Sequence, residues 1–101
     1  MSVQEQTNHV EGENRGQVAL FALSTCGWCR KTKQLLNELG VGYSYVDVDQ
    51  LQGADREEAL QQLRIFNPDI SFPTIVIDGE HCIVGFKEDE VREALSDGRR
   101  D

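Results

Sequence analysis

The stretch Ser24-Thr25-Cys26-Gly27-Trp28-Cys29-Arg30 stands between two segments of different pattern. The segment before it, residues 18–23, is continuously apolar, which is typical of a short strand buried on both faces. The segment after it, residues 29–39, repeats residues for one buried face at spacings of three and four: Cys29, Thr32, Leu36 and Leu39. This pattern predicts a helix that turns Cys29 toward the core and leaves Cys26 near its open N-terminal end.

Two cysteines at the start of a helix indicate thiol chemistry. Unpaired backbone N–H groups and the positive end of the helix dipole favour a thiolate over a thiol at this place. We therefore expect Cys26 to be a nucleophile and Cys29 to be its resolving partner. Ser24 or Thr25 is expected to cap the helix. Arg30 follows Cys26 by four residues, so it is expected on the same side of the helix, either stabilising the thiolate or as a solvated surface charge.

Trp28 and Cys82 each allow two interpretations. Trp28 lies between the paired cysteines and is expected to be a partly exposed platform for a partner, the alternative being a buried anchor. Cys82 falls on the last predicted strand, where it is interpreted as a small apolar residue, the alternative being an exposed regulatory thiol.

The composition restricts the class of protein. The chain has 101 residues and a formal net charge of −8, so we expect one domain, a monomer, and no nucleic-acid partner. No apolar run reaches the roughly 20 residues of a membrane-spanning helix, and the polar N-terminus has no core of a secretory signal, so no membrane contact is expected. The count of three cysteines excludes a complete internal disulfide framework. We therefore expect a reducing cytoplasm, where close cysteine pairs are catalytic or metal-binding more often than structural.

The rest of the chain predicts one small α/β domain. Residues 1–16 are interpreted as a flexible polar leader, residues 17–97 as the domain, and residues 98–101 as a polar tail. After the first strand and helix, strands are expected over residues 43–48, 74–77 and 81–84, and helices over residues 53–66 and 87–95. The first crossover makes a parallel pair of strands and Asp78-Gly79 predicts a hairpin, so the expected sheet is mixed, with helices on both faces.

Three motifs of the chain resemble the glutaredoxin family of the thioredoxin superfamily: Cys26-Gly27-Trp28-Cys29, Phe72-Pro73-Thr74 and Val84-Gly85-Phe86-Lys87-Glu88-Asp89. The resemblance covers about residues 17–96. It implies a thioredoxin-like fold with a mixed four-stranded sheet of order 2-1-3-4 and three helices. It also implies a dithiol–disulfide oxidoreductase, an electron carrier that reduces protein or small-molecule disulfides.

The resemblance also implies where a substrate binds. The bond before Pro73 would be cis, although trans is the default for a proline, and the backbone of Phe72 would be free to pair with a bound peptide or thiol. With the candidates from the first motif, the implied substrate-binding residues are Trp28, Arg30, Phe72, Pro73, Thr74, Gly85, Phe86 and Asp89.

The identity of the electron donor depends on departures from the glutathione-using members, which commonly carry a Pro-Tyr pair between the cysteines and a Gly-Gly pair near the last helix. This chain has Gly27-Trp28 and Gly85-Phe86 there, and Phe86 would crowd the place of a glutathione backbone. Residues 85–89 look more like the glutaredoxin-like redoxins that serve ribonucleotide reductase and take electrons from a thioredoxin reductase. Such a reductase is therefore favoured over glutathione as donor, and no tightly bound cofactor is expected.

Glutathione as co-substrate remains the alternative. Asp89 would then receive the α-amino group of glutathione. The alternative is that Asp89 is only an acid at a helix N-terminus, where the helix dipole favours it. A local patch of Arg30, Lys33 and Lys87 would offset the negative charge of the chain.

Two other classes of protein compete with a thiol carrier. A zinc module would draw ligands from Cys26, Cys29, His81 and Cys82, but adjacent strand residues point to opposite faces, which makes one tetrahedral site difficult to close. A dimer that bridges an iron–sulfur cluster is a variant of the metal-binding hypothesis, although cluster-binding glutaredoxins usually have a single active-site cysteine. A redox-inactive interaction domain of the same fold is the third reading, and the intact cysteine pair opposes it.

Overall fold

The computed structural model describes residues 8–14 and 16–95. Its elements, in chain order, are β1 (Asn8–Val10), β2 (Val18–Ala22), α1 (Gly27–Leu39), β3 (Tyr43–Asp47), the short 3-10 helix η2 (Val48–Gln50), α2 (Gly53–Phe66), β4 (Thr74–Ile77), β5 (His81–Val84) and α3 (Glu88–Leu95). Within this part of the chain, α2, β4 and β5 have the predicted bounds, whereas α1 begins two residues earlier than predicted.

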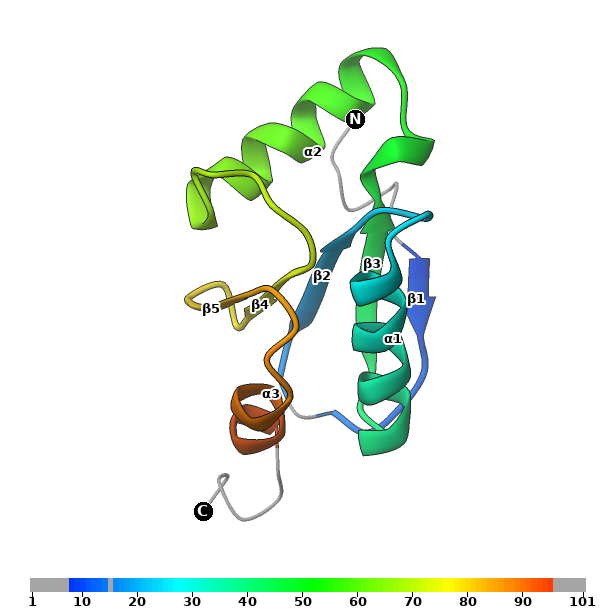
Figure 1. Cartoon of the computed structure of the whole chain (residues 1–101), viewed down its shortest axis with the longest axis vertical. Helices are drawn as coiled ribbons and strands as arrows, with labels where there is room; N and C mark the ends of the chain where they lie inside the picture. The colour runs from blue at the N-terminus through cyan, green and yellow to red at the C-terminus, as the bar shows by residue number, and fades with distance from the viewer. Residues whose placement is uncertain (1–7, 15, 96–101) are drawn as a thin grey trace.

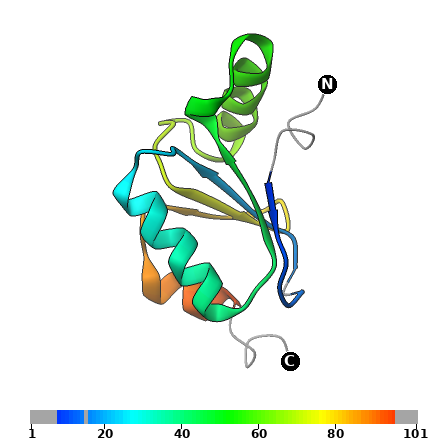
Figure 2. The same cartoon turned by 90° about the vertical axis from the view of Figure 1, so that its right-hand side faces the viewer.

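The strands form one mixed sheet in the order β1-β3-β2-β4-β5 (Figure 1). Strands β2 and β3 are parallel, as expected from the crossover through α1, and β4 pairs antiparallel with both β2 and β5. The four predicted strands are β2, β3, β4 and β5. They lie in the order β3-β2-β4-β5, which is the predicted order 2-1-3-4 when these four strands are numbered along the chain. Helices α1 and α3 lie together on one side of the sheet (Figure 2), while α2 packs on the other face, so the prediction of helices on both faces is confirmed.

A fifth strand, β1, lies within residues 1–16, the segment that was predicted to be a flexible leader. Strand β1 pairs antiparallel with β3 at the edge of the sheet, with His9 opposite Ser44. The chain then stays on that edge, because Glu13 exchanges hydrogen bonds with the backbone of Gly40 and Gly42. A Cβ atom on Gly12 would come within 2.5 Å of the Val41 carbonyl carbon, so this approach requires glycine.

The prediction of a four-stranded sheet with a flexible segment over residues 1–16 is therefore wrong for residues 8–14. The rest of the expected leader, residues 1–7 and 15, lies outside the described residues, as do residues 96–101 with the end of the predicted domain and the polar tail.

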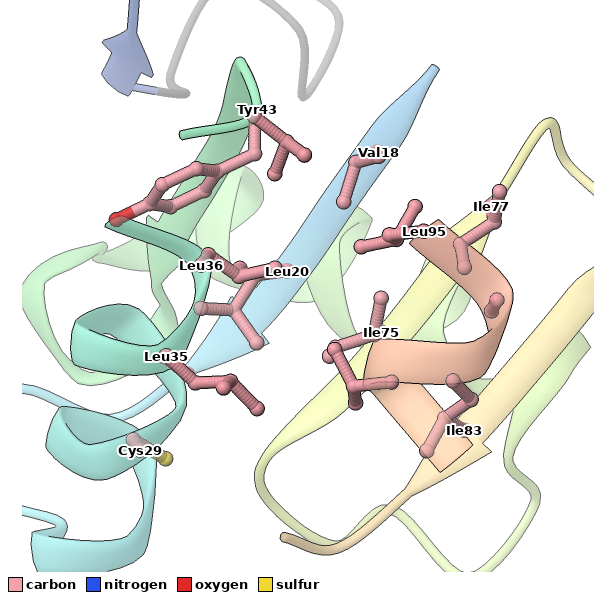
Figure 3. Packing of buried hydrophobic residues seen from close by; sticks show 14 residues of the cluster. Val18, Leu20, Cys29, Leu35, Leu36, Tyr43, Ile75, Ile77, Ile83 and Leu95 are labelled. Atoms are coloured by element: carbon pink, nitrogen blue, oxygen red, sulfur yellow. The ribbon is translucent and has the colours of Figure 1, made fainter. Parts of the chain in front are cut away.

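The two faces of the sheet carry separate cores. Alternation along β2 sends Val18, Leu20 and Ala22 toward α1 and α3, and sends Phe21 toward α2. Figure 3 shows the larger core, where side chains of α1, α3, β2 and β4 meet and Cys29 lies on the inward side of α1. The helix that carries the cysteine pair is thus fixed to the sheet by its buried face, while its first turn is left at the edge of the domain.

Candidate functional site

Cys26 is the residue that caps α1. Its backbone is extended (φ −90°, ψ 121°), and its Sγ accepts a hydrogen bond from the backbone N–H of Cys29 at 3.2 Å. The sulfur therefore receives one of the N–H groups that a helix N-terminus leaves unpaired. The expectation that Ser24 or Thr25 would cap the helix was wrong, because the half-buried Cys26 takes this position itself.

Cys29 is in a different environment. Its side chain is fully buried, and its Sγ accepts a hydrogen bond from the backbone N–H of Leu23 at 3.5 Å. Burial raises the pKa of the Cys29 thiol to about 12, and a hydrogen bond with Cys26 adds to the rise. Both cysteines are free, so the site is in its dithiol form, with an accessible sulfur above a buried protonated one.

A groove of about 270 Å³ is lined by Trp28, which lies between the two cysteines in the chain, and by Phe72, Pro73, Gly85 and Phe86. All five were predicted to contact substrate. The Phe72-Pro73 peptide bond is cis, as the resemblance implies. The N–H of Gly85 donates to the carbonyl of Pro73 at 2.8 Å, and Gly85 has φ of 85°, a conformation that L side chains rarely adopt. This pairing brings the second and third motifs together although 12 positions separate Pro73 from Gly85 in the chain.

Two aromatic rings form one wall of this groove. Trp28 is 58% exposed and stacks on Phe86, with ring centroids 5.7 Å apart and planes at 29°. The ammonium of Lys31 lies 5.1 Å from the Trp28 ring centroid. The predicted exposure of Trp28 is thus confirmed and the alternative of a buried anchor is wrong, while its role as a platform for a partner stays a prediction.

Thr74 does not reach the groove with its side chain. It is fully buried, and its hydroxyl donates to the carbonyl of Ser71 at 2.9 Å and accepts from Nδ2 of Asn67 at 3.1 Å. The hydroxyl is therefore used to hold the loop that precedes β4. The side chain of Thr74 therefore has a structural role, and substrate binding by Thr74 stays a prediction.

The charged candidates differ in their exposure and in their partners. Arg30 is exposed on α1 and Asp89 is exposed in the first turn of α3, and among the described residues neither has an ion-pair partner within 4 Å. Lys33 bonds Asp47 at 3.1 Å and covers the Tyr45 ring, so it is turned toward β3. A patch of Arg30, Lys33 and Lys87 was therefore the wrong expectation, because Lys33 is engaged elsewhere.

One part of the site was missed by sequence reasoning. The carboxylate of Asp49 accepts hydrogen bonds from the backbone N–H and the hydroxyl of Ser24, at 2.8 and 2.6 Å. Nε2 of Gln50 also donates to the Ser24 hydroxyl, at 2.9 Å. These bonds lower the pKa of Asp49, chiefly through the Ser24 hydroxyl. Because 25 positions separate Ser24 from Asp49, no local pattern indicates the contact.

Among the described residues, the ligands of the zinc hypothesis do not form a metal site. Cys82 is half-buried on β5, where its thiol donates to the carbonyl of Phe66 at 3.5 Å, and His81 is exposed. Over residues 8–14 and 16–95, no three His, Cys, Asp or Glu side chains are placed to hold a metal ion. The environment of Cys82 fits the prediction of a small strand residue, and burial raises the pKa of its thiol. In the same part of the chain, no helix has the length and apolar character needed to cross a membrane.

Comparisons with known proteins agree with this geometry. A family model described as Glutaredoxin matches residues 18–82. The crystal structure of a glutaredoxin from Methanosarcina mazei Go1 is 55% identical, covers 90% of this chain and 88% of its own, and superposes with a TM-score of 0.83. The structure of Methanosarcina acetivorans methanoredoxin is 49% identical, covers 84% of this chain and 90% of its own, and gives a TM-score of 0.82. An uncharacterized glutaredoxin-like 8.6 kDa protein in the rubredoxin operon of Clostridium pasteurianum is 31% identical over 78 residues, which are 77% of this chain and 96% of that protein.

Proposed function

Because this chain belongs to the glutaredoxin family, whose members are thiol–disulfide oxidoreductases, we propose that it works as a dithiol carrier with Cys26 as the attacking sulfur and Cys29 as the resolving sulfur. The observation that carries this assignment is the asymmetry of the pair. Cys26 is partly accessible and accepts the Cys29 N–H, whereas Cys29 is fully buried with a pKa raised to about 12.

The reaction then proceeds in two exchanges. The thiolate of Cys26 attacks one sulfur of a substrate disulfide, the substrate S–S bond breaks, and the released sulfur leaves as a thiolate that takes up a proton. The Cys29 thiol next gives up its proton and attacks Sγ of Cys26, so that the second substrate thiol is released and a Cys26–Cys29 disulfide forms. The substrate gains two electrons and the protein loses two, which a reductant must return.

The groove at Trp28 is suited to a polypeptide substrate. Three of its five lining residues are aromatic, Trp28, Phe72 and Phe86, and they offer apolar surface to residues flanking a substrate cysteine. Among the described residues, the backbone of Phe72 has no hydrogen-bond partner, so its polar groups are available to pair with an extended peptide. We therefore propose protein disulfides as the main substrates, and ribonucleotide reductase as one of them because of the resemblance of residues 85–89. A protein that works as a dithiol requires a reducing compartment, so we assign it to the cytoplasm.

For the electron donor we favour a thioredoxin-type reductase. Phe86 stacks on Trp28 and occupies a wall of the groove, which narrows the place where a glutathione backbone would lie. Lys33, one of the three residues expected to form a positive patch for anionic glutathione, is already paired with Asp47. Glutathione is the second candidate, because Arg30 and Asp89 are both exposed and free to meet its carboxylate and α-amino groups.

The electron donor can be identified by measuring reduction of one disulfide substrate with two different reducing systems. We expect faster turnover with NADPH and thioredoxin reductase than with glutathione and glutathione reductase. Phe86→Gly, which restores the Gly-Gly pair of glutathione-using members, is expected to raise the glutathione-dependent rate by roughly tenfold, since one removed steric conflict is worth about 1.4 kcal/mol. Faster turnover of the wild type with glutathione, together with no gain in Phe86→Gly, would assign glutathione as the donor and remove Phe86 as the discriminating residue.

A further inference from the structure

The loop that leads into the helix of the cysteine pair is held from outside by one carboxylate. Asp49 accepts two hydrogen bonds from Ser24, one from its backbone N–H at 2.8 Å and one from its hydroxyl at 2.6 Å. Gln50 adds a third contact to the Ser24 hydroxyl. Hydrogen bonds to an ionised acceptor are roughly twice as strong as neutral ones, and two of them fix orientation as well as distance.

The carboxylate itself is well anchored. Asp49 lies in η2, which directly follows β3. The neighbouring Val48 has only 2% of its surface exposed and is buried in the core beneath α2. The position of Asp49 is therefore set by the sheet and by the core on the face opposite α1. The hydrogen bonds from Ser24 to Asp49 fix the loop of residues 23–26 relative to this position.

The clamped loop ends at Cys26. Its first residue, Leu23, donates its N–H to Sγ of Cys29 and accepts the N–H of Cys26 at 3.2 Å. Ser24 is the next residue after Leu23 and lies two residues before Cys26. The Leu23 N–H thus positions Sγ of Cys29, and Cys26 is itself the last residue of the four-residue turn that Asp49 holds in place through Ser24.

We propose that Asp49 is a positioning residue for Cys26, which acts by holding Ser24 and so keeps the nucleophilic sulfur against the Cys29 N–H at the start of α1. This inference rests on the proposed role of Cys26 but concerns a residue outside the cysteine pair and the groove. The depressed pKa of Asp49 agrees with it, because the same hydrogen bonds that hold Ser24 favour the carboxylate.

Two substitutions separate positioning from charge. Asp49→Ala removes the charge and both hydrogen bonds, whereas Asp49→Asn removes the charge but keeps an oxygen for the Ser24 N–H and an amide that donates to the Ser24 hydroxyl. If the carboxylate acted only through its negative charge, both substitutions would favour the thiolate of Cys26 and would move its alkylation to lower pH. If it acts by positioning, only Asp49→Ala should have a large effect, and in the opposite direction.

The experiment measures the rate of Cys26 alkylation by iodoacetamide across pH in the full chain, together with kcat/KM for disulfide reduction. We expect Asp49→Ala to move the alkylation profile to higher pH and to lower kcat/KM by roughly tenfold. This loss is smaller than the roughly 100-fold that a 1 Å misplacement of a reacting group can cause. Asp49→Asn should stay within about twofold of the wild type, since it keeps both contacts. Glu57→Ala, which removes an exposed carboxylate on α2, serves as the matched control and should change neither quantity.

An unchanged profile in Asp49→Ala, even with a lowered melting temperature, would overturn the proposal and leave Asp49 a purely structural residue. A shift of both Asp49 variants to lower pH would also overturn it, in favour of a charge effect. Because alkylation needs no disulfide substrate, the clamp is tested even if the wild type reduces none of the substrates tried, an outcome that would count against the proposed function alone.

Discussion

Replacing Cys26 with serine is expected to lower disulfide reduction by roughly 1,000-fold or more, because a hydroxyl cannot replace a thiolate as the attacking group. The remaining thiol of the pair cannot substitute for it. Cys29 is fully buried beneath the first turn of α1, and its pKa of about 12 keeps it protonated at neutral pH. The rate is measured as reduction of a protein disulfide coupled to the donor system of the wild type.

The control for this variant is Cys82→Ser. Cys82 is bonded to the carbonyl of Phe66 and does not line the groove at Trp28, so its replacement should leave the rate within about twofold of the wild type. Comparison of melting temperatures shows that each variant is folded. Substantial activity in a folded Cys26→Ser protein would exclude Cys26 as the nucleophile.

Replacing Cys29 with serine is expected to stop the reaction halfway. Cys26 would still attack the substrate, but the mixed disulfide would persist because no second sulfur lies within the site to release it. Turnover should fall by roughly 100-fold and should then rise with the concentration of an external thiol, since an intramolecular step is replaced by a bimolecular one. Mass spectrometry under non-reducing conditions should find the substrate joined to Cys26.

The serine at position 29 keeps an acceptor for the N–H of Leu23, so the turn before the helix is expected to persist. Cys29→Ala, which lacks that acceptor, is the second variant and should accumulate the same adduct. Failure of both folded variants to trap substrate, with turnover unchanged, would contradict the resolving role of Cys29.

Local patterns in the sequence were sufficient to predict most of the fold. The apolar run before the cysteines, the spacing of Leu36 with Cys29, and the Asp78-Gly79 turn each depend on residues close together in the chain, and the structure confirms the strand, the helix and the hairpin that they indicate. The resemblance of the motifs added the cis bond before Pro73 and the groove residues, which cannot be derived from periodicity.

The features that could not be predicted depend on partners far away in the chain. Strand β1 has three residues and no clear alternation, and its structure comes from pairing with β3 and from the close approach at Gly12. The Ser24–Asp49 contact likewise exists only after β3 is paired beside β2.

The central claim is that one sulfur is reachable and reactive while the other is buried and protonated. The most direct measurement is alkylation of the reduced native protein with iodoacetamide at about pH 6 to 9, with each cysteine quantified by mass spectrometry. We predict much faster modification of Cys26 than of Cys29 throughout this range, because the Cys29 thiol is fully buried and its pKa is raised to about 12. Equal modification of the two cysteines, or protection of Cys26 in the folded protein, would contradict the account.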